Sequence, residues 1–293
     1  REKECASVKT SEPKKVLIAG GGVAGLEAAI ILQKRGHQAI ICEASDRLGG
    51  QFITAGKAPR KAEMAAAAVA MGNKAERLGA EIRLNTPVTK ELIKEINPDT
   101  VFNAIGSEPI VPNIPGVDHS FVYNSHDVLE GKITPEGNVV VVGGGLVGLE
   151  VCEYLAEKGC KVTVVEMLPA ICMDMGDARK TCVMESVYGA GINVQTEVMV
   201  NAIEEGKVLG TKANETVEYS CDSVVMAIGA KSRCGKEIEE ATREIGAGYM
   251  VIGDANMARR ALDAIKEGHD AAMTFDDPQV HADISKPKKV IAV

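Results

Sequence analysis

Six glycines fall into two identical patterns that suit the binding of a phosphorylated ligand. The first pattern is Gly20-x-Gly22-x-x-Gly25, and the second is Gly143-x-Gly145-x-x-Gly148. In each pattern the first glycine permits a tight turn, the second lets a diphosphate approach the backbone, and the third lets a helix pack on a sheet. The free N–H groups at the start of that helix would hold the anion without any Lys or Arg.

An acidic residue follows each pattern at the same distance. Glu43 and Glu166 each stand 18 residues after the last glycine of their pattern. A carboxylate at this place can bind the two hydroxyls of a ribose, and it would repel a 2′-phosphate. A single glycine pattern could also be a plain structural turn, so the elements around it must decide. The two patterns together predict two dinucleotide sites, and Glu166 favours NADH over NADPH if the second site binds nicotinamide.

Both glycine patterns stand between a strand and a helix. Residues 16–43 and 139–166 align without a gap at an offset of 123, with ten identities in 28 positions. Each segment opens with β-branched residues typical of a buried strand, and a glycine (Gly36 or Gly159) ends the helix before a second strand begins. The same offset relates residues 104–106 to residues 227–229. The repeat predicts two related α/β domains with parallel sheets.

The remaining segments extend this plan. In the first half the sequence predicts a helix over 62–78 and a strand at 81–84. In the second half it predicts a helix over 178–188, a strand at 192–195 and an antiparallel meander near 198–203, 207–211 and 216–219. The segments 107–116 and 229–236 are predicted hinges because they are rich in Pro or Gly. A strand at 249–255 and a helix over 257–275 lie outside the repeat and must pack on one of the two domains.

The composition excludes several classes of protein. Of the 293 residues 45% are hydrophobic and 25% charged, which predicts a packed core rather than disorder. The longest apolar run, Met64 to Met71, is far shorter than the roughly 20 residues that span a bilayer. A net charge of −8, with five Tyr, four Phe and no Trp, argues against a nucleic-acid surface. Eight cysteines without a C-x-x-C pair indicate mostly buried free thiols in a reducing cytoplasm.

The features that differ between the halves carry a resemblance. After Glu43 comes DRLGGQ (46–51), where adjacent glycines leave room for a second backbone approach, and Gly253-Asp254 stands within MVIGDA. The sequence resembles the two-dinucleotide flavoproteins, in which FAD is bound first and an NAD(P)H domain is inserted into the FAD domain. The resemblance implies that Gly253-Asp254 binds the ribityl chain of FAD and that the helix after Arg260 starts beside the flavin ring.

The absence of two cysteine motifs argues against the disulfide-reductase branch of that family. The disulfide reductases carry C-x4-C after the first acid or C-x-x-C in the NADPH domain, and neither motif occurs here. The amino-terminal REKE and the junction at Pro13 resemble the family of 2-enoate reductases, 2,4-dienoyl-CoA reductases and trimethylamine dehydrogenase. That resemblance implies an FMN barrel and a 4Fe-4S cluster in a missing amino-terminal portion. Cys5 alone cannot hold such a cluster.

We therefore predict an α/β fold of two Rossmann-like, three-layer domains. The FAD-binding domain comprises residues 14–110 and 232–278, the inserted NAD(H)-binding domain comprises 111–231, and 1–13 is a linker. The predicted function is electron input to an NADH-dependent flavin oxidoreductase, from NADH to FAD and onward to Fe-S and FMN. The alternatives are a stand-alone NADH:acceptor oxidoreductase and a structural ADP-binding module. A cytoplasmic location without membrane or nucleic-acid partners is expected, and a homo-oligomer is compatible with the sequence.

The predicted cofactor-binding residues divide between the two halves. Those of the first half and the final segment are Gly20, Gly22, Val23, Ala24, Gly25, Glu43, Ala44, Arg47, Gly50, Gln51, Val88, Ala104, Gly106, Gly253, Asp254, Arg260 and Ala261. Those of the second half are Gly143, Gly145, Leu146, Val147, Gly148, Glu150, Glu166, Ala227 and Gly229. Glu150 resembles a glutamate near the nicotinamide end of related pockets, and the alternative is a solvated helix-face residue. No side chain is assigned to catalysis, because the flavin carries out hydride transfer, and no metal site is predicted.

Overall fold

The computed structural model describes residues 9–173 and 175–276, except for the side chains of residues 177 and 178. The described chain forms two compact units. The first unit comprises residues 9–53, 66–107 and 232–276, and the second comprises residues 54–65 and 108–231. Cys5 and most of the predicted linker lie outside the described residues, as do positions 277 and 278 of the predicted FAD domain.

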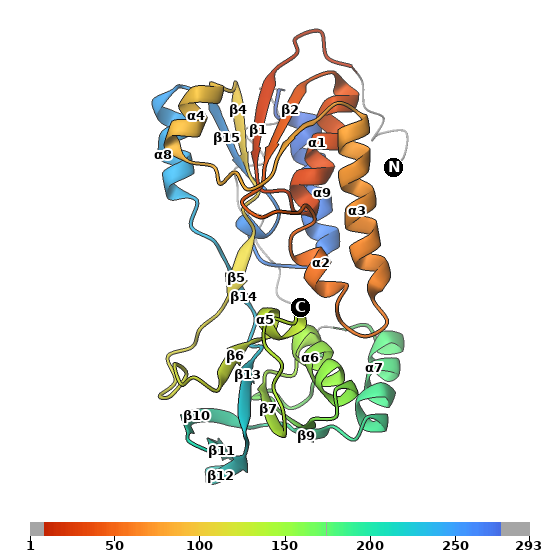
Figure 1. Cartoon of the computed structure of the whole chain (residues 1–293), viewed down its shortest axis with the longest axis vertical. Helices are drawn as coiled ribbons and strands as arrows, with labels where there is room; N and C mark the ends of the chain where they lie inside the picture. The colour runs from red at the N-terminus through yellow and green to blue at the C-terminus, as the bar shows by residue number, and fades with distance from the viewer. Residues whose placement is uncertain (1–8, 174, 277–293) are drawn as a thin grey trace. The chain divides into compact units, whose positions relative to one another are not determined.

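The first unit is built on a five-stranded parallel sheet (Figure 1). Its strands, in the spatial order β15-β4-β1-β2-β3, are β15 (Gly248–Val251), β4 (Thr100–Asn103), β1 (Lys15–Ala19), β2 (Gln38–Cys42) and β3 (Glu81–Arg83). The central strands are almost completely buried, which explains their runs of Val, Leu and Ile. The strand β15, which lies outside the repeat, pairs with β4 at the edge of this sheet.

Helices cover both faces of this sheet. The apolar side chains of α1 (Val23–Arg35), α3 (Ala62–Arg77) and α9 (Ala261–Thr274) form the core on one face. The opposite core includes side chains of α4 (Lys90–Ile96) and α8 (Lys236–Glu244). A short helix, α2 (Gln51–Ala55), follows the second strand, and a 3-10 turn, η1 (Gly253–Ala255), precedes α9. The three layers confirm the predicted Rossmann-like architecture of this half.

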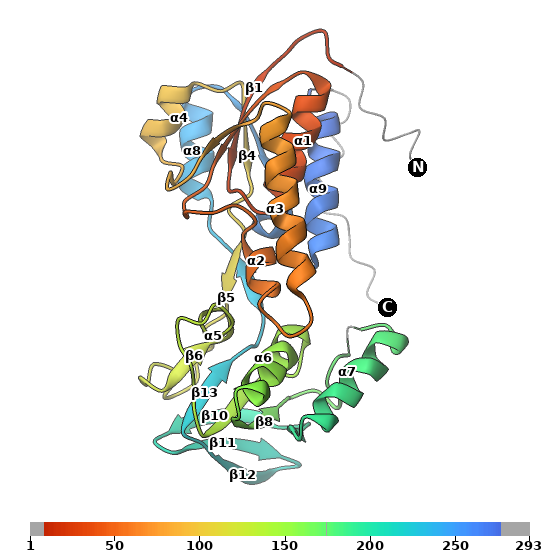
Figure 2. The same cartoon turned by 45° about the vertical axis from the view of Figure 1, so that its right-hand side comes forward.

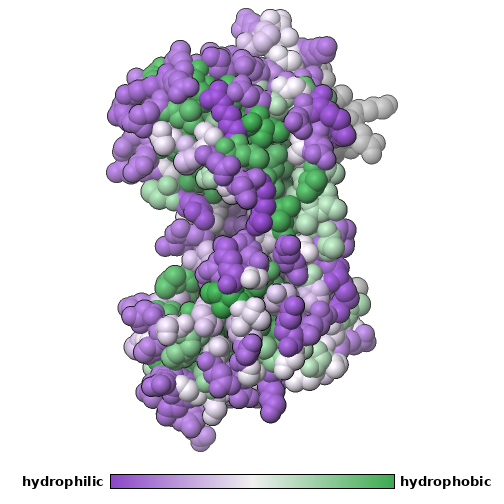
Figure 3. All heavy atoms as spheres, viewed as in Figure 1, coloured by the Kyte–Doolittle hydropathy of each residue, from purple (hydrophilic) through white to green (hydrophobic). Residues whose placement is uncertain are grey.

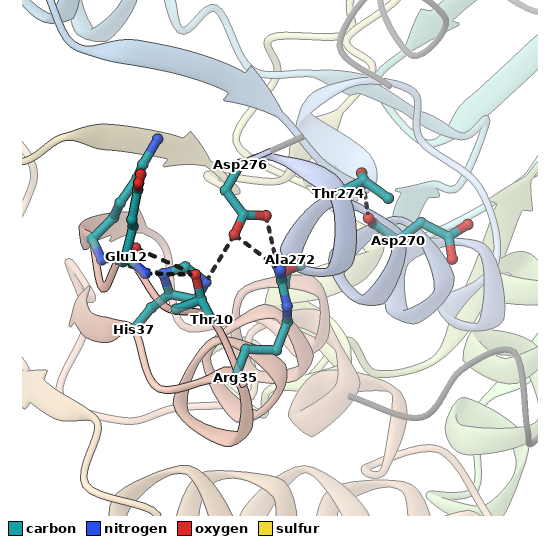
Figure 4. A network of polar contacts seen from close by, with 9 residues as sticks. Thr10, Glu12, Arg35, His37, Asp270, Ala272, Thr274 and Asp276 are labelled. Atoms are coloured by element: carbon teal, nitrogen blue, oxygen red, sulfur yellow. Dashed lines mark hydrogen bonds and ion pairs between the residues drawn. The ribbon is translucent and has the colours of Figure 1, made fainter. Parts of the chain in front are cut away.

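Helix α9 lies alongside α1, as both views show (Figures 1 and 2). Its carboxyl-terminal end is fixed to the end of α1 by Arg35 (Figure 4). The guanidinium donates to the carbonyl oxygen of Ala272 at 2.8 Å and to both carboxylate oxygens of Asp276 at 2.8 and 2.9 Å. His37 lies 3.4 Å from the same carboxylate, and burial lowers the pKa of this histidine, although Asp276 opposes the shift. The network anchors the last helix of the unit.

The second unit repeats the sheet in the spatial order β6-β13-β7-β8-β9. Its parallel strands are β6 (Val122–Asn124), β13 (Ser223–Met226), β7 (Asn138–Val142), β8 (Lys161–Val165) and β9 (Asn193–Gln195). One face packs on α5 (Ser125–Leu129), α6 (Leu146–Glu157) and α7 (Asp177–Gly189). The other packs on an antiparallel meander, β10 (Met199–Glu204), β11 (Lys207–Lys212) and β12 (Glu215–Ser220), which confirms the predicted meander.

The internal repeat extends to the pairing register of the strands. Val16 lies opposite Ala39 in the first sheet, and Val139 lies opposite Val162 in the second, so both positions are shifted by the same 123 residues. The predicted hinges contain β5 (Ser107–Pro109) and β14 (Ala230–Ser232), which pair as a two-stranded sheet. The shared register shows that the two five-stranded parallel sheets have the same arrangement in both units.

One segment lies elsewhere than the predicted first domain suggests. The prediction ran without interruption from 14 to 110, whereas residues 54–65 and 108–110 belong to the second unit. Polar contacts account for the first of these segments. Thr54 donates to Glu130 at 2.8 Å, and Arg60 pairs with Glu153 at 3.1 Å. These side-chain contacts could not be predicted from the sequence, because they follow no periodic pattern.

The surface drawn in Figure 3 is covered mostly by hydrophilic residues, with smaller apolar areas among them. Within the described part of the chain, no helix has the length and apolar character needed to cross a membrane.

Candidate functional site

The first glycine pattern forms a turn in which two glycines are required by packing. Gly20 has a φ of +110°, and a Cβ added there would stand 2.3 Å from the carbonyl oxygen of Ala104. A Cβ at Gly25 would stand 2.2 Å from the carbonyl oxygen of Gly20. The strand β1 can therefore pass directly into helix α1 only because neither position carries a side chain. Ala104, a predicted site residue, contributes its backbone to this turn.

Among the residues that the structure describes, none requires a glycine at the middle position of the pattern. Gly22 is the N-cap of α1, with φ −69° and ψ 177°, a conformation open to any residue. A Cβ built there would meet no atom within 4 Å. The N–H groups of the first helical turn, which begins with Val23 and Ala24, have no acceptor within the helix. The empty space at Gly22 is thus a cradle that a Cβ would fill, and it fits a diphosphate.

The second pattern has the same geometry. Gly143 has a φ of +110° and approaches the carbonyl oxygen of Ala227, and a Cβ at Gly148 would stand 1.9 Å from the oxygen of Gly143. Gly145 is the N-cap of α6, and a Cβ there also meets nothing within 4 Å. The helix then begins with Leu146 and Val147. The structure therefore contains two equivalent cradles, one in each unit.

The two predicted ribose carboxylates are held next to their cradles. Glu43 accepts the N–H of Gly21 at 2.7 Å and the N–H of Ser45 at 2.8 Å. Glu166 accepts the N–H of Gly144 at 2.6 Å and the N–H of Leu168 at 2.8 Å. Each oxygen of an ionised carboxylate has lone pairs left after these bonds. Both carboxylates are therefore held in place by backbone N–H groups and can accept further hydrogen bonds.

The cradles differ in the loop that follows the second strand. In the first unit Gly49 pairs with Gly22, and a Cβ at Gly50 would stand 3.2 Å from the Cα of Gly22. Gly49 and Gly50 both have positive φ, +105° and +50°. The positions 123 residues later hold Cys172, which has a φ of +55°, and Met173, which is 58% exposed. The first loop thus leaves room for a second backbone approach, whereas the second loop carries side chains there.

A further group of residues extends the first cradle. The carboxylate of Asp254 accepts from the hydroxyl of Ser107 at 3.4 Å, and Gln51 donates to that hydroxyl at 2.9 Å. Burial raises the pKa of Asp254, and hydrogen bonds from the Arg259 backbone and from Ser107 oppose the shift. The structure therefore brings Gln51 and Asp254 together through a serine that the sequence reasoning did not single out.

The other predicted residues lie around these groups. Ala44 and Arg47 are exposed on the loop after β2, and Val88 is partly buried against the core that includes α4 and α8. Gly106, at φ +78°, accepts the N–H of Arg233, while Gly229, at φ +105°, accepts the N–H of Ile110. Arg260 is the N-cap of α9, and Ala261 is the first residue of that helix.

Glu150 is buried, so its interpretation as a solvated helix-face residue is wrong. Its exposed fraction is 6%, and its carboxylate pairs with the ammonium group of Lys61. Burial raises the pKa of Glu150, and the hydrogen bond and charge of Lys61 act in the opposite direction. Lys61 escaped the sequence reasoning because it stands 89 residues away, in the segment that packs on the second unit. A buried ion pair thus lies one helical turn behind the Gly145 cradle.

The cysteines of the described residues form no disulfide. Of the seven described cysteines, Cys42, Cys152, Cys172 and Cys221 are buried, as expected for most of them. Burial raises the pKa of Cys42 to about 11 and also raises that of Cys152. Such thiols are protonated at neutral pH and react poorly.

Two protein families match the chain. Residues 61–260 match the pyridine nucleotide-disulphide oxidoreductases, and residues 18–79 match the NAD(P)-binding Rossmann-like domain. The first match covers more than half of the chain and includes the second cradle, and the second match covers the first cradle.

Three relatives show the same relationship over a larger part of the chain. It is 38% identical to an NADH oxidase of Thermoanaerobacter brockii, covering 88% of this chain and 40% of the relative. It is 35% identical to a cinnamate reductase of Clostridium sporogenes, covering 93% of this chain and 41% of the relative. The solved structure of 2-naphthoyl-CoA reductase with 2-naphthoyl-CoA superposes with a TM-score of 0.87 at 30% identity, covering 92% of this chain and 41% of that one.

The chain therefore spans about two fifths of the length of these relatives. The predicted resemblance to reductases of the 2-enoate type is confirmed, and FAD and NADH are the cofactors that the family and these relatives indicate. With its two glycine cradles and its two parallel sheets, the chain belongs to the pyridine nucleotide-disulphide oxidoreductase family.

Proposed function

We propose that this chain is the electron-input part of a larger NADH-dependent flavin reductase, with FAD in the first unit and NADH in the second. The observation that carries the assignment is the difference between two otherwise equal cradles. Gly50 leaves open backbone beside Gly22, whereas the equivalent position of the second unit carries the side chain of Met173. FAD, whose ribityl and ring system continue beyond the diphosphate, suits the first cradle.

The group around Asp254 supports the same assignment. Its carboxylate, the Ser107 hydroxyl and the Gln51 amide form a polar chain within the first unit, in the segments that follow the strands β15, β4 and β2. Ligands of open α/β sheets bind outside the carboxyl ends of the strands. These side chains are therefore suited to the hydroxyl-rich ribityl chain of FAD.

The second unit supplies what NADH requires. The Gly145 cradle would bind the diphosphate, and Glu166 would bind the adenosine ribose and disfavour a 2′-phosphate. We assign the Lys61–Glu150 pair to the nicotinamide end of the site. There Lys61 would oppose the effect of burial on the Glu150 carboxylate and connect the helix α6 to the segment 54–65.

The chemistry itself belongs to the cofactors: NADH donates a hydride, and FAD accepts two electrons and can release them one at a time. The protein orients the two and excludes water. We propose that electrons continue to an Fe-S cluster and FMN in the rest of the protein. The relatives, of which this chain covers about two fifths, include reductases of unsaturated acids and thioesters by name.

The test is the absorption spectrum of the purified chain. We expect it to take up FAD and show the visible bands of oxidised flavin, and we expect NADH to bleach these bands under anaerobic conditions faster than NADPH does. A chain that binds ADP but no FAD would refute the proposal in favour of a structural module. Rapid steady turnover of NADH with a small electron acceptor, equal to that of complete reductases, would instead favour a stand-alone oxidoreductase.

A further inference from the structure

The turn that carries Gly253 and Asp254 is closed by a carboxylate from the helix that follows it. Glu267, in the second turn of α9, accepts the N–H of Gly253 at 2.9 Å. Its other oxygen accepts from the side-chain amide of Asn256 at 3.4 Å and pairs with the guanidinium of Arg259. One side chain therefore holds the beginning, the middle and the end of the segment 253–259.

The same segment determines the orientation of Asp254. The backbone N–H of Arg259 donates to Oδ1 of Asp254 at 3.2 Å, while the guanidinium of that arginine pairs with Glu267. Arg259 thus connects the two carboxylates, because its backbone binds one and its side chain binds the other. If Glu267 released the arginine, the N–H that orients Asp254 would lose its fixed position.

The helix that carries Glu267 is itself fixed against the first cradle. A Cβ on Gly268 would stand 2.2 Å from the carbonyl oxygen of Ala24, and a Cβ on Gly253 would stand 2.7 Å from the Cβ of Ala24. Ala24 belongs to the first turn of α1. Because interiors are close-packed, a contact this tight leaves little freedom to slide. At its other end α9 is held by Arg35, as Figure 4 shows.

We propose that Glu267 is a positioning residue for FAD, which sets the distance and orientation of Asp254 relative to the diphosphate cradle at Gly22. The inference rests on the proposed function and deepens it. The cradle and Glu43 act on the adenosine diphosphate half of the cofactor, whereas the turn of Asp254 acts on the half beyond it. Loss of Glu267 should therefore impair the binding of FAD and leave the binding of ADP almost unchanged.

The experiment compares three variants with the unchanged chain by equilibrium dialysis against FAD and, in separate runs, against ADP. Glu267→Ala removes every contact of the carboxylate. Glu267→Gln keeps an oxygen that can accept the N–H of Gly253 but removes the charge that pairs with Arg259. Asp270→Asn is the matched control, because it removes one negative charge from the same helix at an exposed position one turn further on.

We expect Glu267→Ala to raise the Kd for FAD roughly 10- to 100-fold, the factor that corresponds to one lost hydrogen bond to a charged group. The Kd for ADP should change by less than about 3-fold in the same variant, which also shows that the first unit is folded. Glu267→Gln, which keeps an acceptor for Gly253 but releases Arg259, should raise the Kd for FAD less than Glu267→Ala does, and Asp270→Asn should match the unchanged chain. The visible bands of bound flavin should shift in Glu267→Ala alone.

Two outcomes contradict the inference in different ways. If the unchanged chain binds ADP but no FAD, the proposed function is refuted, and this inference with it. If the unchanged chain binds FAD and Glu267→Ala either binds it equally well or loses FAD and ADP affinity in parallel, the assignment of FAD stands and the positioning role is refuted.

Discussion

Gly145 offers a substitution that separates ligand binding from folding. The N-cap backbone of this glycine has φ −75° and ψ −177°, which alanine adopts without strain. A Cβ there would point into space that holds no protein atom within 4 Å. If that space is the cradle for the NADH diphosphate, Gly145→Ala should leave the fold intact and block the ligand.

The expected sizes of the two effects differ clearly. Alanine is a poorer N-cap than glycine by an amount on the order of 0.5–1 kcal/mol, which would lower the Tm by only about 1–4 °C. A methyl group that keeps an anionic oxygen away from the helix amides removes at least one hydrogen bond to a charged group. That loss is worth about 1.5–3 kcal/mol, or roughly a 10- to 100-fold higher Kd for NADH.

Gly148→Ala is the natural contrast within the same pattern. Its Cβ would stand 1.9 Å from the carbonyl oxygen of Gly143, so the helix α6 would have to move off the strand. Overpacking of this kind costs about 1–3 kcal/mol or more, and the Tm should fall further than in Gly145→Ala.

The assay pairs calorimetric titration with NADH and a thermal unfolding scan for each variant. The reasoning is refuted if Gly145→Ala binds NADH within about 3-fold of the unchanged chain, because the open space at this glycine would then not be the diphosphate cradle. It is equally refuted if Gly145→Ala destabilises the chain as much as Gly148→Ala, since binding and folding could then not be separated.

Three further predictions concern other parts of the chain. Glu166→Ala should reduce the preference for NADH over NADPH roughly 10-fold, because it removes the acceptor for a ribose and the charge that repels a 2′-phosphate; unchanged preference in titrations with both nucleotides would remove Glu166 from this role. Gly268→Ala should lower the free energy of unfolding by about 1–3 kcal/mol, since its Cβ would meet the backbone of Ala24, and a urea titration with an unchanged midpoint would contradict this. Burial alone would raise the pKa of Asp276, but the Arg35 guanidinium lowers it below the usual range, so this carboxylate stabilises the fold above the pKa of an unfolded Asp, about 3.9. That stability should be lost as the pH falls through the lower folded pKa, and Asp276→Asn should flatten the acid limb of the curve of unfolding free energy against pH.

The fold was predictable because its signals are local and repeated. The strands at 16–19 and 139–142 are runs of β-branched or aliphatic residues that end in glycine, and the same order of elements occurs twice at one offset. The strand at 249–255 and the helix over 257–275 lie outside the repeat, and the sequence alone said only that they pack on one of the two domains; the structure pairs β15 with β4 of the first sheet. The segment 54–65 was placed with the first domain, because its association with the second unit depends on side-chain pairs that no period records.

Site residues were predictable where the backbone geometry requires a particular residue type. They were not predictable where their role depends on contact with a residue far away in the sequence. The glycines and Glu43 were marked in the sequence because a bound diphosphate and ribose would need them at this spacing. Lys61 did not follow, because any of the 33 basic residues could have neutralised Glu150. Ser107 and Glu267 were also missed, since each acts by holding a group that the sequence had already marked.

The loop of Cys172 in the second unit keeps the backbone conformation of the Gly49 loop in the first unit, although its residues are no longer glycine. Cys172 keeps the left-handed backbone that Gly49 has at the equivalent position, and its N–H still binds the oxygen of Gly144 just as that of Gly49 binds Gly21. The turn is thus a property of the fold, retained even where a Cβ makes it costly. If FAD binds the first unit and NADH the second, the side chains of Cys172 and Met173 help to determine which of the two cofactors the second unit accepts. The glycines at 49 and 50 leave room for FAD to extend beyond its diphosphate. In the second unit the side chains of Cys172 and Met173 stand at the equivalent positions, which disfavours FAD there.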